Sequence, residues 1–246
     1  MIFKERLRYG FMRKNRAKSK TTKKVESKKD SYRSLEAIFN AAPRLFDFRN
    51  VQKVLEGTLP YAEMRAAVLG VVAAALLSVI LNLVVNEMLL FTYESVSEIS
   101  ETEIEMPVIT PLISIVAMGV LSVVLVLAVE LLAYWIARAF GGKGTYEQQL
   151  YLFSAVNISI AIASFLILAT IIPCAGFLAA VAYFILTVYL SLYVRTKAYV
   201  LVHGLSLLKA FVVVIIATIV MLLLSFAAYI MVMTLTNPEA LLIPGA

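Results

Sequence analysis

The chain of 246 residues is 61% hydrophobic and 15% charged, whereas soluble domains are about 45–50% apolar and about 25% charged. With a mean hydropathy of +0.89, this composition excludes a water-soluble monomer. The single cysteine, Cys174, and the single histidine, His203, exclude an internal disulfide and metal sites built from several such residues.

Residues 1–30 form a basic tail with 12 of the 22 Lys and Arg residues. A block of like charge stays disordered and solvated, and near a bilayer each basic group gains about 1 kcal/mol from anionic lipid. Two interpretations are open: a cytoplasmic tether to lipid or to a partner, or a topogenic tail without a dedicated ligand. Basic charge without interleaved aromatic residues does not indicate nucleic-acid binding.

Residues 31–65 have the apolar spacing of short amphipathic helices, interrupted by Pro43 and Pro60. Arg44, Arg49 and Lys53 fall on the polar side, with phenylalanines opposite. Such a segment either lies in the membrane interface or docks onto the cytoplasmic face of the protein itself.

Five hydrophobic segments follow, each long enough to cross about 30 Å of hydrocarbon: residues 66–91, 112–140, 149–172, 176–194 and 207–235. The sequence therefore predicts an all-α integral membrane protein. Its five-helix transmembrane domain occupies residues 66–236, and residues 237–246 form a short terminus.

The basic residues predict the orientation of this bundle. Of the 22 Lys and Arg, 17 precede the first span, and the other five lie in or beside two connections on the same side as the tail: Arg138, Lys143, Arg195, Lys197 and Lys209. The opposite connections, including the glutamate-rich loop 92–107, contain none. Since basic residues stay inside, we expect a multi-pass cell-membrane protein with a cytoplasmic N-terminus and a non-cytoplasmic C-terminus.

The two basic connections contain helix stop and start signals. Gly141 and Gly142 favour a helix end, and Thr145 followed by Gln148 is a capping-box pattern. In the second connection, Gly204 is suited to end an extended fourth helix, and a serine two residues later can cap the fifth.

The same connections contain the motifs of a known family. Phe-Gly-Gly-Lys-Gly-Thr at 140–145, His-Gly-Leu-Ser at 203–206 and Lys-Ala at 209–210 resemble the Yip1 domain family in its prokaryotic form, over roughly residues 43–224. The resemblance implies five spans, a cytoplasmic N-terminus and a non-enzymatic membrane protein. Eukaryotic relatives act in vesicle trafficking, associate with one another and contact Rab-type GTPases through N-terminal regions. The basic tail has no counterpart of those acidic and aromatic regions, so GTPase binding is not carried over.

Small and polar residues recur on one face of the first and third spans. They are Ala66, Gly70, Ala74, Ser78, Asn82 and Asn86 in the first, and Ser154, Asn157, Ala161 and Ser164 in the third. Such rows are typical of close helix packing. The alternative is a polar path for a small solute or a lipid head group between the two faces.

Glu130 is the single carboxylate well inside a span. An isolated intramembrane carboxylate often belongs to a proton or cation pathway. The alternative is that the second span leaves the membrane early, so that Glu130 pairs near the cytoplasmic interface with Arg195, Lys197 or Lys209.

The expected binding face consists of Lys143, Arg195, Lys197 and Lys209, with His203 as a head-group contact or as an interfacial residue at a helix end. Gly-Gly-Lys-Gly-Thr lacks the spacing of a Walker loop, and we find no motif for a catalytic, metal or cofactor site.

We therefore expect a non-enzymatic adaptor or membrane-organising protein, with the row 66–78 carrying contacts to a second copy or a membrane partner. The alternative is a small transporter or channel subunit that uses Glu130, Asn157 and the third-span serines. A conduit requires a continuous polar cavity that reaches the middle of the membrane, whereas an adaptor does not.

Overall fold

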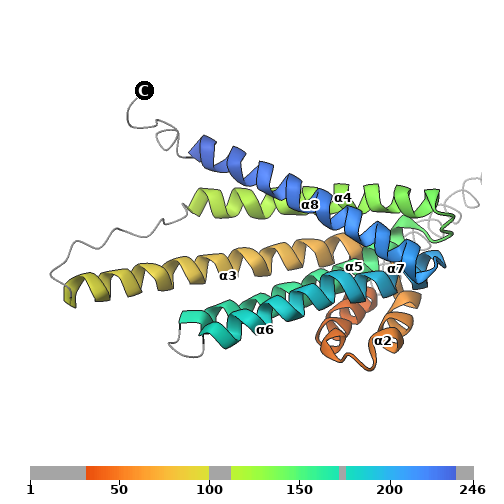
Figure 1. Cartoon of the computed structure of the whole chain (residues 1–246), viewed down its shortest axis with the longest axis horizontal. Coiled ribbons are helices and arrows are strands. Elements are labelled where there is room, and N and C mark those ends of the chain that lie inside the picture. The colour runs from red at the N-terminus through yellow and green to blue at the C-terminus, as the bar shows by residue number, and fades with distance from the viewer. Residues whose placement is uncertain (1–31, 100–111, 172–175, 237–246) are drawn as a thin grey trace, which may run out of the picture.

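The computed structural model describes residues 32–99, 112–171 and 176–236, and all regular structure in these ranges is helical (Figure 1). Five helical stretches are long and apolar enough to cross a membrane: Met64–Met88, Leu112–Ala139, Tyr146–Ala169, Gly176–His203 and Leu207–Val232. The predicted five-span helical architecture is thus confirmed. The predictions for the tail 1–30, the turn at Cys174 and the terminus 237–246 lie outside the described residues.

The spans correspond to α3 (Met64–Ile99), α4 (Leu112–Ala139), α5 (Tyr146–Ser164) with η3 (Phe165–Ile171), α6 (Gly176–Val188) with η4 (Tyr189–Val194) and α7 (Arg195–His203), and α8 (Leu207–Thr236). One boundary differs from the sequence prediction, because α3 continues to Ile99, where a loop was expected from Thr92. The fourth span extends beyond its hydrophobic segment 176–194 to His203, and Gly204 ends this extended helix as predicted. A π-helical turn, η4, joins α6 to α7.

The helix α5 is the centre of the bundle. In an apolar stretch of 18 residues from each span, half of the residues are buried in the span that contains α5, against 17–22% in the other four spans. α3 packs mainly on α5, and α4 packs mainly on α8. Elsewhere the outer faces stay apolar and exposed, as at Phe177 and Leu222, which is the surface that hydrocarbon covers in a membrane protein.

The small-residue row of α3 explains the close approach of α3 to α5. A Cβ added at Gly70 would lie 2.7 Å from the Cβ of Ser154, and Ala66 and Ala74 are also buried. The row therefore packs inside one chain. This corrects the expectation that it associates with a second copy, because its small residues are not on an open surface.

Residues 32–61 form a helical hairpin, which we call the hairpin. It comprises a helix over residues 32–41, η1 (Ala42–Phe46), α2 (Val51–Thr58) and η2 (Leu59–Tyr61). Its side chains Ile38, Leu45 and Leu55 are at most 2% exposed against the bundle. Of the two predicted placements, docking onto the protein itself is the one observed.

The hairpin lies at one end of the bundle. α7 and the loop after α4 lie at the same end (Figure 1). At this end the predicted capping box is present: Thr145 Oγ1 accepts from the Gln148 N–H, and the Gln148 side chain accepts from the Thr145 N–H. Gly204 ends α7 with φ +65°, a left-handed conformation that favours glycine.

Candidate functional site

The two glycine-containing motifs, at 140–145 and 203–206, contact each other at the hairpin end. The backbone N–H of Lys143 donates to the carbonyl oxygen of His203 at 3.0 Å. A Cβ on Gly142 would lie 2.9 Å from that of His203, and a Cβ on Gly144 would clash with Val202. The glycines are therefore needed because the first loop covers the C-terminal end of α7 at backbone distance.

A buried polar cluster lies beneath this contact. Glu130 on α4 is 2% exposed, and its Oε2 and carbonyl oxygen lie 3.0 and 2.8 Å from Nε2 of Gln149 on α5. Tyr199 on α7 approaches the same Glu130 Oε2 at 3.4 Å and Gln149 Nε2 at 3.2 Å. Two helices, α5 and α7, thus supply groups that satisfy a buried carboxylate of α4.

Gln149 also determines how His203 is protonated. Because its Nε2 donates to Glu130, its Oε1 is the acceptor that faces Nε2 of His203 at 3.0 Å. His203 therefore carries a hydrogen on Nε2, an assignment made from the network. Its Nδ1 is buried and has no hydrogen-bond partner in the described part of the chain.

Arg195 supplies the positive charge of the cluster. Its Nη1 lies 3.5 Å from Oε1 of Glu130, and its Nη2 donates to Oδ1 of Asn157 at 2.7 Å. The guanidinium also lies over the ring of Phe153, 5.5 Å from its centroid. Of the three partners proposed for Glu130 from the sequence, the structure places Arg195 beside it.

The expected binding residues do not form one face. Arg195 and His203 point into the bundle, whereas Lys143 and Lys209 are exposed and Lys197 lies over the ring of Tyr193. Lys209 donates to the carbonyl of Phe140. Of these five residues, the three lysines are therefore the ones available for a head-group contact.

The polar residues of the third span divide into two roles. Ser154 donates to the carbonyl of Tyr151 at 2.7 Å, and Ser164 donates to that of Ile160 at 2.9 Å, so both hydroxyls bond to their own helix. Asn157 links Arg195 to a cavity of about 240 Å³, which Ser78 also lines.

Sequence reasoning missed Gln149 and Tyr199. A spacing of four residues would have indicated both. One face of α7 contains Arg195, Tyr199 and His203, which follow each other at intervals of four. One face of α5 contains Gln149 and Asn157, which are eight residues apart. Residues four apart share a helix face. The polar rows could thus be read from the sequence, but their meeting point could not.

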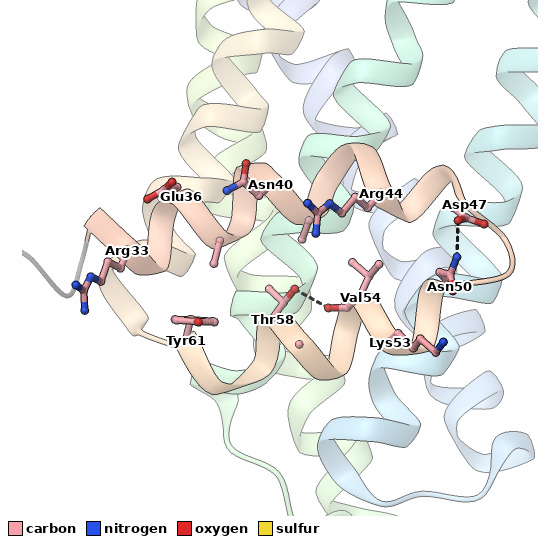
Figure 2. A pocket seen from close by; sticks show the side chains of 13 residues that line it. Arg33, Glu36, Asn40, Arg44, Asp47, Asn50, Lys53, Val54, Thr58 and Tyr61 are labelled. Carbon is pink, nitrogen blue, oxygen red and sulfur yellow. Dashed lines mark hydrogen bonds between the residues drawn. The ribbon is translucent and has the colours of Figure 1, made fainter.

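A groove of about 740 Å³ lies on the outer side of the hairpin (Figure 2). Helix 32–46 supplies Arg33, Glu36 and Arg44 to its rim, and α2 supplies Lys53. At the turn, the side-chain amide of Asn50 and the N–H of Arg49 donate to Asp47 at 2.7 and 3.0 Å. These hydrogen bonds hold the pKa of Asp47 below its usual range, so the rim contains charges of both signs.

The described residues contain no group of three or more His, Cys, Asp or Glu placed to hold a metal ion. Five apolar helices of spanning length define the chain as a multi-pass membrane protein. A family model of the Yip1 domain matches residues 55–229, from α2 through most of α8. The chain therefore belongs to the Yip1 domain family. No curated protein and no solved structure matches it.

Proposed function

We propose that this protein is a non-enzymatic membrane adaptor that holds a helical segment of a partner protein in the groove of its hairpin. In this proposal the hairpin end faces the cytoplasm, as the distribution of basic residues favours. The observation that carries the proposal is that the hairpin is fixed on its inner side while its outer side is open (Figure 2).

Buried contacts along α5 fix the hairpin. The hydroxyl of Tyr151 donates to the carbonyl of Ser34 at 2.6 Å. The hydroxyl of Ser159 is shared between the carbonyl of Ala42 in the hairpin and that of Ala155 in α5, both at 2.8 Å. At the turn, Phe48 contacts the ring of Tyr189 with centroids 4.2 Å apart. A partner that binds this surface meets a preorganised groove and does not have to order it, which lowers the cost of binding.

The shape and charge of the groove fit an amphipathic helix. Its floor is made of small or short side chains, including Ala37, Ala41 and Val54, and a Cβ added at Gly57 would meet nothing within 4 Å. Small residues let a third helix approach closely, and the charged rim suits flanking residues of either sign. The proposed occupant is a helical segment of a partner membrane protein. This helix would have small or apolar residues on one face and charged residues of both signs beside them.

The adaptor would also use its basic surface. Lys143, Lys197 and Lys209 and the tail 1–30 are available to anionic lipid head groups, each basic group contributing about 1 kcal/mol near the surface. This attraction would hold the hairpin at the membrane but would not select a partner.

Site-specific photo-crosslinking in native membranes tests the proposal. A photoreactive amino acid at Asn40, which lines the groove, should capture one protein, whereas the same group at Gln52, exposed on α2 outside the groove, should not. Gly57→Leu fills the floor without a clash and should abolish capture at Asn40, while Gln52→Leu should preserve it. Equal capture from both positions, or capture that survives Gly57→Leu, contradicts the groove assignment. If capture of the partner is lost only when residues 1–30 are deleted, the partner binds the tail and not the groove.

A small transporter or channel subunit is the second candidate, favoured by the cavity that reaches Asn157. In this case Glu130→Gln should abolish solute-driven current or proton uptake in liposomes. Full flux in that variant would remove Glu130 from the path.

A further inference from the structure

Two adjoining cavities separate α3 and α5 from α4 and α8. One has about 370 Å³ and the other about 240 Å³. Both are lined by Ala75, Ser78 and Ser122, so they meet at these residues, and we call the pair the α3–α4 crevice. It is separate from the hairpin groove, and at its inner end Asn157 accepts a hydrogen bond from Arg195 of the Glu130 cluster.

The α3–α4 crevice runs from the end opposite the hairpin to the middle of the bundle. Asn82 and Tyr229 are exposed at its mouth. Ser78 lies ten residues before the end of its span at Met88, and Ser122 lies ten residues after Leu112, which places both about 15 Å inside the bundle. Ser78 and Ser122 therefore place polar groups of the crevice at mid-membrane depth.

The crevice offers hydrogen bonds but no charge. The hydroxyls of Ser78 and Ser122 donate to carbonyls of their own helices at 3.0 and 2.8 Å, and Nδ2 of Asn82 donates to the carbonyl of Ser78, which leaves their oxygens as acceptors. At the inner end, Nδ2 of Asn157 is buried without a hydrogen-bond partner among the described residues. No charged side chain lines either cavity.

This combination selects the chemistry of a ligand. A hydroxyl group both donates and accepts, so it can satisfy the Asn157 amide and the serine oxygens together. An ionic head group would lose its hydration without gaining a counter-charge, because Arg195 is already engaged by Glu130 and Asn157. The site therefore favours a neutral hydroxylated group.

The surroundings of the crevice indicate that this group belongs to a lipid. Apolar side chains next in sequence to its lining residues are exposed, including Ile80 and Leu76 on α3 and Val116 and Val120 on α4. Acyl chains would lie along these faces. We propose that the α3–α4 crevice binds the neutral hydroxylated head group of a lipid, of the diacylglycerol type, from the leaflet opposite the hairpin.

Cysteine accessibility in phosphatidylcholine nanodiscs tests this site, in a Cys174→Ser background that removes the single native cysteine. A water-soluble thiol reagent should label Ser122→Cys faster than Val124→Cys, which lies two residues away and is 57% exposed on α4. Adding dioleoylglycerol at about ten times its dissociation constant should slow labelling of Ser122→Cys about tenfold. Adding phosphatidylglycerol should not slow it.

A second variant checks the location of the bound lipid. Ser78→Leu fills the crevice and should remove protection by dioleoylglycerol, whereas Ala227→Leu, on the exposed surface of α8, should retain it. Equal labelling of Ser122→Cys and Val124→Cys, absence of protection, or equal protection by phosphatidylglycerol would overturn the proposal. Equal protection by free glycerol would also overturn it and would favour a solute site.

Discussion

Neutralising one partner of the Glu130–Arg195 pair should destabilise the protein more than neutralising both. The two charged atoms lie 3.5 Å apart, which corresponds to about 5 kcal/mol of attraction at an effective dielectric constant of about 20. Removing one member of a buried pair typically costs about 3–5 kcal/mol. Because Arg195 keeps its bond to Asn157 and its side chain is 14% exposed, we expect Glu130→Gln to cost about 3 kcal/mol.

The double-mutant cycle of Glu130→Gln and Arg195→Met isolates this interaction. The double variant leaves no uncompensated charge and should cost about 1 kcal/mol, so the coupling energy should be about 2 kcal/mol or more. Sodium dodecyl sulfate titration in mixed micelles, followed by far-ultraviolet circular dichroism, measures the free energy of unfolding. Glu87→Gln, at an exposed position of α3, is the matched control. If the two single effects add in the double variant, the pair does not contribute as argued.

Three further changes test the two connecting motifs and the hairpin. Gly142→Ala should destabilise the protein by about 1–3 kcal/mol in the same titration, because its Cβ would meet a backbone oxygen at 2.7 Å, whereas Gly57→Ala should not destabilise it. Ser159→Ala removes a bond to the hairpin, costs about 1 kcal/mol and should increase proteolysis of the hairpin, whereas Ser164→Ala, whose hydroxyl bonds within α5, should not. Folding lowers the pKa of Asp47, so the ionised side chain stabilises the folded turn. This stabilisation is complete at pH values above the pKa of the unfolded chain, about 3.9, and is lost as the pH falls through the pKa of the folded protein. The protection factor for hydrogen exchange in the turn, which is the intrinsic rate at each pH divided by the observed rate, should therefore change little from pH 7 to about 5. It should fall below about pH 4.

The elements of the fold were readable from the sequence because each depends on local signals. Apolar length predicts the spans, and the capping box at Thr145 and the left-handed Gly204 depend on neighbours within a few residues. Gly204 likewise predicted that the fourth helix extends beyond its hydrophobic segment, although α7 contains Arg195 and Lys197. The composition of α7 did not show that it packs against Glu130 and Gln149 inside the bundle.

The candidate site was only partly predictable because it depends on contacts between helices. Glu130 and Arg195 were both recognisable as unusual, and pairing was one of the alternatives for Glu130. Gln149 is a different case, since its amide bonds to Glu130 and His203 across helices that are distant in sequence. Gly70 is a different case: its row was correctly interpreted as close helix packing, but the further assignment to a contact with a second copy or partner was wrong. A small residue that touches α5 and one that touches a partner look identical in sequence.

The depth of the buried pair follows from the length of the bundle and can be measured without a mutation. α4 has 28 residues, or about 42 Å of helix, against about 30 Å of hydrocarbon, so about 12 Å projects beyond it. The hairpin packs through η1 on α5 and η4 and has a charged rim on its open side, which places the excess at the hairpin end and Glu130 near the boundary. Trp135, the single tryptophan, lies five residues beyond Glu130 and is 64% exposed, so it should lie in the interface. Its fluorescence should be quenched most by lipids brominated near the ester end of the acyl chain; stronger quenching by bromines at mid-chain would mean that the pair lies deep in the hydrocarbon.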